Sequence, residues 1–256
     1  KIIENERIDT IMPTSGSDLI PYSKNKKSIE EKGIIVAMSD YQVIESCLDK
    51  LRFYHQLKNK FNLPYTTTDQ SEINAFPCIV KPIWGKGSKN VFTCHSKANL
   101  ENILLKNHDM VIQEYLPGKE YSIDVLSDLE GKPLLAIPRE RIEVKAGISF
   151  KSRIVLDNVI AKECLRIAEC LSIKGPSCVQ MRCDKKGKPR VVEVNPRIGG
   201  GTILTTYAGV NFPELVLAMA SASSYKIPKL KELKEITMFR YYEEVILDAK
   251  GRVMKL

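Results

Sequence analysis

The sequence has few histidines and no long apolar run. Its three histidines, His55, His95 and His108, are scattered without the spacing of metal ligands, so neither a histidine-based zinc site nor a catalytic triad is expected. No apolar stretch approaches the roughly 20 residues that a membrane helix needs, and the start of the chain lacks a charged segment followed by an apolar core. We therefore expect a cytoplasmic protein that does not contact a membrane.

Paired cysteines are lacking as well. The seven cysteines are odd in number, contain no Cys-x-x-Cys spacing and lie mostly in apolar segments. This pattern is typical of reduced, buried thiols and excludes a disulfide framework.

The chain does have an ordinary apolar content and an excess of positive charge. Its 256 residues are 43% hydrophobic and 27% charged, with a net charge of +8, which allows a core for one or two domains. Basic surfaces attract nucleic acids as well as small polyanions. The basic residues of 81–89 and 139–153 lie near the candidate site described below, whereas those of 24–27 and 229–234 have no interleaved aromatic residues. We therefore favour a small polyanionic ligand over nucleic acid.

A hairpin near the C-terminal end carries polar residues at strand spacing. Glu193 and Asn195 lie two residues apart on an apolar strand, so they point to the same face. The preceding strand, 177–184, brings Gln180 toward the same pocket through the turn 185–189. Three oxygen ligands of this kind suit magnesium with bound nucleotide phosphates. An ordinary half-buried hairpin is the alternative.

A second candidate element is a basic glycine loop. The apolar strand 76–82 contains Lys81 and leads into Gly85, Lys86, Gly87 and Ser88, after which β character resumes at Val91. Glycines let backbone amides approach a phosphate, and the lysines supply charge. The spacing fits neither a P-loop nor a dinucleotide-binding fingerprint, and a plain surface hairpin is the alternative.

A third segment lies between these two and makes the pattern specific. It contains Gln113-Glu114-Tyr115-Leu116 and, after a Pro-Gly turn, Glu120. Five features follow one another along the chain: a strand with a lysine near its end, Gly-Lys-Gly-Ser, Gln-Glu-Tyr-Leu with a glutamate four residues on, a Gln, and Glu-x-Asn-Pro-Arg. This ordered set resembles the motifs of the ATP-grasp superfamily. Within that superfamily it is most similar to the synthetase domains of the carbamoyl phosphate synthase large chain and to related stand-alone ligases. The match runs from about Cys47 to Gly209.

The resemblance implies a role for each matching position. Gln180, Glu193 and Asn195 match magnesium ligands, with manganese as a substitute ion, and Arg197 matches the arginine beside the reacting phosphoryl group. Together with the glycine loop, the positions that would contact ATP are Lys50, Lys81, Gln113, Glu114, Tyr115, Leu116 and Glu120. Lys50 and Lys81 would bind phosphate, residues 114–116 would line the adenine pocket, and Glu120 would bind ribose. We predict Arg197, Lys81 and Arg141 as the residues that act on the reacting groups.

Two further groups are candidates for binding the substrate carboxylate. Arg139 or Arg141 could recognise it in a bidentate manner, and the turn of Gly199, Gly200, Gly201 and Thr202 could offer backbone amides to it. Structural ion pairs of these arginines with Glu140 or Glu143 are an equally weighted alternative.

The expected fold is α/β, specifically the α+β two-lobed ATP-grasp fold after a partial N-terminal βαβ segment. Residues 1–48 would form the partial N-terminal domain, and residues 49–256 the ATP-grasp domain, with a small lobe at about 65–112 and a large lobe at about 113–256. Because relatives carry a fuller N-terminal domain and the chain starts at Lys1, we expect a trimmed form of a longer protein. The expected helices span 17–32, 50–61, 97–107, 159–172 and 212–222, and another begins after Ser39 as its cap. The expected strands are 9–13, 33–37, 77–82, 90–94, 110–115, long strands within 119–144, the two strands of the metal hairpin, and 239–246.

Three functions compete on this pattern. The favoured one is an ATP-dependent ligase that joins a small-molecule carboxylate to an amine, and the resemblance allows a homodimer. The second is a synthetase that forms carboxyphosphate or carbamoyl phosphate, which is weakened because the chain contains one ATP site and no glutaminase segment. The third is a nucleotide-binding regulator without catalysis.

Overall fold

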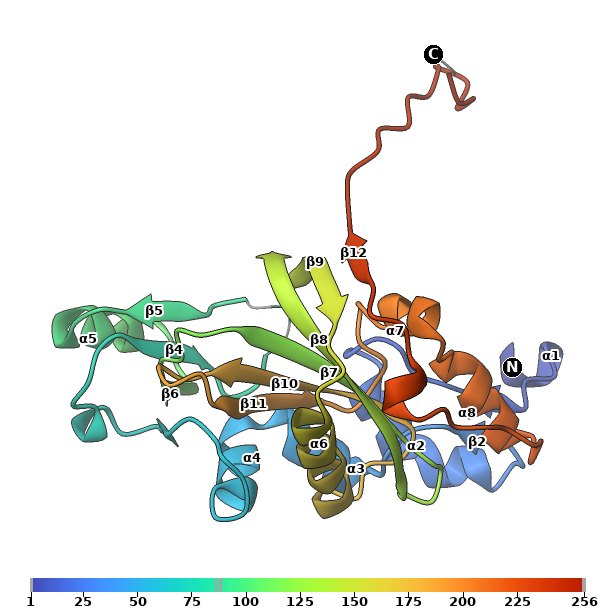
Figure 1. Ribbon diagram of the computed structural model, residues 1–256, viewed down its shortest axis with the longest axis horizontal. Helices are drawn as coiled ribbons and strands as arrows, with labels where there is room; N and C mark the ends of the chain where they lie inside the picture. The colour runs from blue at the N-terminus through green and yellow to red at the C-terminus, as the bar shows by residue number, and fades with distance from the viewer. Residues whose placement is uncertain (1, 86, 88, 255–256) are drawn as a thin grey trace.

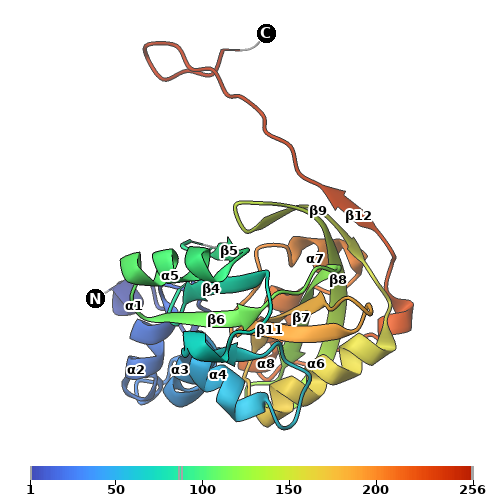
Figure 2. The same cartoon turned by 90° about the vertical axis from the view of Figure 1, so that its left-hand side faces the viewer.

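The computed structural model describes residues 2–85, 87 and 89–254, and it has the expected mixed α/β architecture. Its described strands form a two-stranded, a four-stranded and a six-stranded sheet. Figures 1 and 2 show the four-stranded sheet beside one end of the six-stranded sheet, with the N-terminal helices packed close to the body. None of the described helices has the length and apolar character needed to cross a membrane.

The N-terminal segment is a small βαβ unit, as predicted. Strand β1 pairs in parallel with β2, and α2 connects them. Ser39 is not a helix cap, because its hydroxyl accepts a hydrogen bond from the Lys174 backbone N–H at 2.9 Å instead. Asp40 takes the cap position of the next helix. The elements of this segment are α1 (Ile2–Asn5), β1 (Thr10–Ile11), α2 (Leu19–Glu30), β2 (Ile35–Val36) and α3 (Tyr41–Leu48).

The four-stranded sheet is antiparallel, with the order β3-β6-β4-β5. Helix α4 begins after Asp49, whose side chain accepts the Arg52 amide, and it ends at Leu57 rather than at 61. Ser96 caps α5 in the same way, and the buried side chain of Leu100 joins the core of this sheet. The elements are α4 (Lys50–Leu57), β3 (Thr66–Thr67), η1 (Gln70–Glu72), β4 (Cys78–Pro82), β5 (Phe92–Cys94), α5 (Lys97–Lys106) and β6 (Met110–Glu114).

The six-stranded sheet has the order β11-β10-β7-β8-β9-β12, and all its described pairings are antiparallel. Helix α6, capped by Asp157, packs its buried face against β7 and β8 and builds the main core. The elements are β7 (Glu120–Ser127), β8 (Pro133–Lys145), β9 (Ile148–Ile154), α6 (Asn158–Cys170), β10 (Pro176–Cys183), β11 (Pro189–Asn195), α7 (Ile203–Ala208), α8 (Phe212–Ala220), η2 (Leu230–Glu232) and β12 (Thr237–Phe239).

The C-terminal end differs from the prediction of a strand at 239–246. Only β12 pairs with β9, and Phe239 lies opposite Lys151. Strand β9 begins at Ile148, so its antiparallel partner soon runs past its end. Figures 1 and 2 show the following residues leaving the body as an extended arm. The sequence prediction also missed β9 and α7.

The cysteines behave as predicted. All seven lie within the described residues and are free thiols, and six of them are buried. Burial raises the pKa of the Cys47 thiol to about 12, which keeps this thiol protonated and unreactive near neutral pH.

Candidate functional site

A cavity of about 320 Å³ lies between the four-stranded and six-stranded sheets. Strands β4 and β6 supply one wall, β10 and β11 supply the other, and the residues after β6 connect the two. Most of the predicted ATP and metal residues line it. These are Lys50, Lys81, Gly85, Gly87, Gln113, Glu114, Tyr115, Leu116, Glu120, Gln180, Glu193, Asn195 and Arg197, together with Arg141.

The predicted metal ligands meet in this cavity. Gln180 lies directly opposite Glu193 in the pairing of β10 with β11, and the register shifts just after Gln180. The Asn195 amide donates a hydrogen bond of 3.0 Å to Glu193 Oε1. Among the described residues, Glu193 forms no ion pair within 4.0 Å and no cluster of three His, Cys, Asp or Glu side chains is present. This amide and carboxylate set therefore fits a hard cation such as magnesium and leaves waters or phosphates to complete its shell.

Lys81 lies on the opposite wall and is held in place by a short chain of hydrogen bonds. Its Nζ donates to Gln113 Oε1 at 2.9 Å, and Gln113 Nε2 donates to Thr66 Oγ1 at 2.9 Å. Only 6% of Lys81 is exposed. Burial lowers the pKa of Lys81 to about 8, partly offset by the charge of Glu193, with Lys50 adding to the decrease. A phosphate group at this position would favour the charged lysine.

Lys50, at the start of α4, contacts the glycine loop. Its Nζ donates to the carbonyl oxygens of Ile83 at 3.4 Å and Gly85 at 3.3 Å. Burial lowers the pKa of Lys50, while Glu193 and Asp49 raise it. Lys86 and Ser88, both predicted phosphate contacts, lie outside the described residues.

The glycine loop ends in left-handed backbone. Gly87 has a φ of 66° and Asn90 a φ of 55°, a region in which glycine and asparagine are the least strained residues. Asn90 therefore makes this bend in a conformation that glycine also adopts easily.

The predicted adenine segment closes one end of the cavity. Glu114 uses its side chain structurally: Oε1 accepts from Arg190 Nη1 at 2.8 Å, and Oε2 accepts from the Tyr65 amide at 3.1 Å. Leu116 is buried, and the Arg182 guanidinium lies 5.9 Å from the Tyr115 ring centroid. Tyr115 and Leu116 therefore add an aromatic and an apolar side chain to the lining of the cavity.

Two residues that were predicted for different ligands form one ion pair. Glu120, the predicted ribose carboxylate, accepts from Arg141, a predicted substrate residue. The Arg141 guanidinium also donates to Ser149 Oγ at 3.0 Å and to the Gly147 carbonyl at 2.8 Å. Arg141 thus connects Glu120 on β7 to the β8–β9 hairpin.

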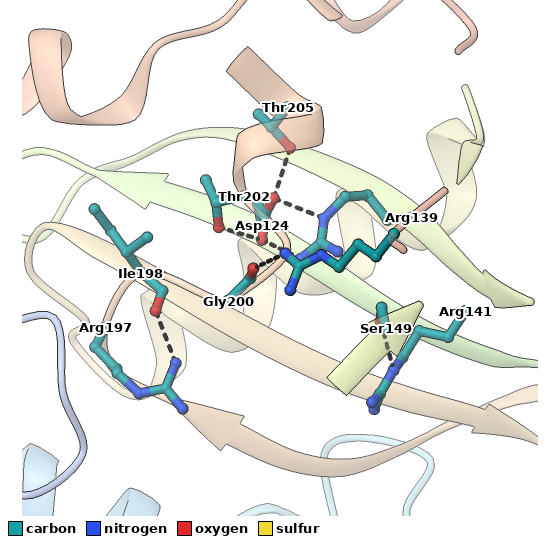
Figure 3. Close-up of polar contacts among 10 residues, drawn as sticks. Asp124, Arg139, Arg141, Ser149, Arg197, Ile198, Gly200, Thr202 and Thr205 are labelled. Atoms are coloured by element: carbon teal, nitrogen blue, oxygen red, sulfur yellow. Dashed lines mark hydrogen bonds and ion pairs between the residues drawn. The ribbon is translucent and has the colours of Figure 1, made fainter. Parts of the chain in front are cut away.

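Arg139 and the turn at 199–202 do not line the cavity. Arg139 is 1% exposed, and its guanidinium holds Asp124, so it pairs with neither Glu140 nor Glu143. Figure 3 shows Arg139, Thr202 and Thr205 around Asp124, with Arg197 apart from this group. The prediction that Arg139 binds substrate is not supported, because this side chain is buried and does not line the cavity. The same buried group covers the inner side of the glycine turn.

Sequence reasoning missed several residues that line the cavity. Arg182 follows Gln180 by two residues on β10, so strand alternation could have placed it there. Lys89, from the predicted basic loop, also lines the cavity, and so do Val144 and Gly147 of the hairpin between β8 and β9. The basic residues of 139–153 indicated that this region lies near the site, but because β9 was not predicted, the sequence did not show that it forms a hairpin.

Comparison with known proteins now identifies the fold family. Residues 106–244, more than half of the chain, match the family described as "ATP-grasp in the biosynthetic pathway with Ter operon". The chain belongs to the ATP-grasp family. A carbamoyl phosphate synthase arginine-specific large chain from Bacillus subtilis (strain 168) is 27% identical over 249 residues, which are 88% of this chain and 24% of that protein. This ATP-grasp chain thus spans about a quarter of the length of the curated relatives that it matches.

Solved structures have the same fold. The biotin carboxylase domain dimer of the 2-oxoglutarate carboxylase from Hydrogenobacter thermophilus, in complex with MgADP, ADP and bicarbonate, has a TM-score of 0.76 at 18% identity over 91% of this chain and 58% of that one. An L-amino acid ligase from Bacillus licheniformis has a TM-score of 0.64 at 22% identity over 85% of this chain and 57% of that one. At these identities the likeness establishes the ATP-grasp fold alone.

Proposed function

We propose that the chain is the catalytic part of an ATP- and magnesium-dependent ligase, which activates a carboxylate as an acylphosphate and joins it to an amine. The observation that supports this most strongly is the convergence of phosphate-binding and metal-binding groups in one cavity. Two lysines face it from one side, and Gln180, Glu193 and Asn195 face it from the other. Family membership and the likeness to an L-amino acid ligase favour the same chemistry.

The cavity residues divide the work between binding and charge compensation. The base lies at the end formed by Tyr115 and Leu116, and Lys50 and Lys81 bind phosphate oxygens. Gln180, Glu193 and Asn195 would hold magnesium, which would supply positive charge to polarise the transferred phosphoryl group. Arg197 lines the cavity next to this set and stabilises the charge that develops on the transferred group.

The reaction needs no nucleophile from the protein. A carboxylate oxygen of the substrate attacks the γ-phosphorus, the bond from that phosphorus to the ADP oxygen breaks, and an acylphosphate forms. The amine then attacks the carbonyl carbon, phosphate leaves, and the amine loses a proton. Two unit charges about 4 Å apart repel by about 4 kcal/mol at an effective dielectric near 20, so the cationic side chains are needed to bring carboxylate and phosphate together.

Bicarbonate is a second candidate for the phosphoryl acceptor. It is favoured by the carbamoyl phosphate synthase relative and by the likeness to a carboxylase domain whose crystals contained MgADP and bicarbonate. ADP release that depends on bicarbonate and needs no other carboxylate would support this alternative.

Magnesium-dependent ADP release tests the proposal. The protein is incubated with ATP, a pool of ¹⁸O-labelled carboxylic acids that includes amino acids, and a pool of amines, with Glu193→Gln as the control. Release that needs both pools, with ¹⁸O transferred to inorganic phosphate, is expected. Tight Mg-ATP binding without turnover in any pool would contradict the ligase and favour a regulatory nucleotide site.

The charge distribution also predicts that the protein does not bind nucleic acid. A binding titration with oligonucleotides at low salt should therefore show no response.

A further inference from the structure

A buried ion pair lies behind the cavity, where β7 and β8 meet the segment that follows β11. Asp124 is 0% exposed and Arg139 is 1% exposed. Arg139 Nε donates to Asp124 Oδ2 at 2.8 Å, and Nη2 donates to Oδ1 at 2.7 Å. Two charges removed from water in this way are tolerated only with good geometry and additional hydrogen bonds.

Two threonine hydroxyls provide those additional bonds. Thr202 Oγ1 donates to Asp124 Oδ1 at 3.1 Å, and Thr205 Oγ1 donates to Oδ2 at 2.6 Å. Each oxygen of the carboxylate therefore accepts two hydrogen bonds, which uses its full capacity. We call Asp124, Arg139, Thr202 and Thr205 the Asp124 clamp (Figure 3). It joins β7 and β8 to the turn after β11 and to the first turn of α7.

The glycine turn fits closely over the clamp. A Cβ atom at Gly201 would lie 2.4 Å from Arg139 Nη1, and one at Gly199 would lie 3.3 Å from Asp124 Oδ1. At Gly200 a Cβ atom would meet nothing within 4 Å. Gly201 is therefore required by close packing on the clamp, and Gly199 is closely packed against it, which gives this turn a structural explanation.

The clamped turn is close in the chain to Arg197, which lines the cavity. Arg197 precedes Gly199 by two residues and lines the cavity. Its backbone N–H donates to the Asn195 carbonyl at 2.8 Å, and its Nη1 donates to the Ile198 carbonyl at 2.7 Å. The backbone around Arg197 is thus fixed by β11 on one side and by the clamped turn on the other.

We propose that Asp124 is a positioning residue for Arg197. Held by Arg139, its carboxylate fixes Thr202, Thr205 and the glycine turn, and so sets the direction from which the Arg197 guanidinium enters the cavity. This inference rests on the proposed function, in which Arg197 contacts the phosphoryl group that ATP has and ADP lacks. The clamp itself does not touch the substrates.

A double-mutant cycle on Thr205 and Arg197 tests the proposal. Thr205 is 0% exposed, and among the described residues the one hydrogen bond of its hydroxyl is to the clamp carboxylate, so Thr205→Val removes this link without changing the side-chain shape much. Thr205→Ser keeps the hydroxyl and is the matched control. Dissociation constants for Mg-ATP and Mg-ADP are measured by calorimetry for the single variants, for Arg197→Met and for Thr205→Val with Arg197→Met, well below each unfolding temperature.

Thr205→Val should weaken the binding of Mg-ATP roughly five- to twentyfold and the binding of Mg-ADP less than about twofold. Residues that are coupled through shared contacts have interaction energies of this size. Thr205→Ser should restore the preference for ATP, and Thr205→Val should have no further effect once Arg197 is methionine. Effects of Thr205→Val and Arg197→Met that simply multiply would overturn the positioning role, as would equal weakening of ATP and ADP. Failure of the proposed function itself is recognised separately, because the unmodified protein would then release no ADP in the turnover assay, whether or not it binds Mg-ATP.

Discussion

Two polar clusters on the same sheet differ in how their charges are balanced. In the Asp124 clamp, a buried carboxylate receives four hydrogen bonds from protein groups and is fully compensated. In the cavity, Glu193 accepts from Asn195 and forms no ion pair within 4.0 Å among the described residues. A closed cluster stabilises the fold, whereas a cluster that lacks part of its compensation is suited to a ligand that brings the missing charge.

The largest expected effect comes from a substitution that disrupts the closed cluster, the Asp124 clamp. Asp124→Asn leaves the Arg139 charge buried without its partner, which should lower the free energy of unfolding by about 3–5 kcal/mol. Denaturant unfolding followed by circular dichroism measures this loss. The matched control is Glu193→Gln, which should change the unfolding free energy by less than about 1 kcal/mol. Equal losses in the two variants would show that the clusters do not differ as described.

The open cluster should show the reverse behaviour in turnover. Glu193→Gln keeps the side-chain shape but removes the negative charge that faces the metal, so Mg-dependent ADP release should fall about 100- to 1000-fold. A steady-state assay across magnesium concentrations checks this. Recovery of the full rate at high magnesium would instead assign Glu193 to metal affinity alone, and an unchanged rate would remove it from the site.

Arg141 sharpens the comparison, because it lies two residues from Arg139 on β8 but lines the cavity. Arg141→Ala should raise the acceptor KM by about tenfold or more, in line with the loss of a hydrogen bond to a charged group. The Kd for Mg-ATP should change little. Arg141→Lys, which keeps the charge, is the control. If the affinity for Mg-ATP falls instead and the acceptor KM stays the same, Arg141 supports ATP binding by positioning Glu120, the predicted ribose carboxylate.

The smallest expected effect is the pH dependence of ATP binding. Because burial lowers the pKa of Lys81 to about 8, below its ordinary 10.5, raising the pH above about 8 removes the charge that binds phosphate. ATP affinity should therefore fall by up to about tenfold per pH unit above pH 8. Lys81→Met should flatten this dependence in titrations at pH 7, 8 and 9. An unchanged slope in that variant would assign the titration to another group.

The same pKa shift has the opposite sign for stability. Between pH 8 and 10.5 the unfolded chain binds more protons at Lys81 than the folded one, so the free energy of unfolding rises with pH in this window. Without nucleotide, unmodified protein should therefore gain stability relative to Lys81→Met as the pH increases from 8 to 10.5. Denaturant unfolding at these two values measures the difference.

The alternation of side chains along strands predicted much of the candidate site. It placed Glu193 and Asn195 on one face, the predicted hairpin turn added Gln180, and the structure brings all three to the cavity. It also placed Lys81 within the strand that forms the facing wall. These side chains follow from a period-two pattern within a strand, which a sequence displays directly. Their roles toward ATP and magnesium stay predictions.

The rest depends on which strands become neighbours. Asp124 reads as a single carboxylate on an apolar strand, and only the pairing of β7 with β8 and the return of the chain after β11 bring Arg139 and Thr205 to it. Arg139 was therefore assigned to substrate. The strand predicted at 239–246 failed for a related reason, since its apolar residues run past the end of β9.

Calorimetric titration of ATP into the protein, with and without magnesium, tests whether the cavity is a magnesium-dependent ATP site. We expect saturable, magnesium-dependent binding at one site per chain, with the magnesium dependence lost in Glu193→Gln and retained in Thr205→Val. ATP binding that is absent, or that is the same with and without magnesium in the unmodified protein and in Glu193→Gln, would show that the cavity is not such a site.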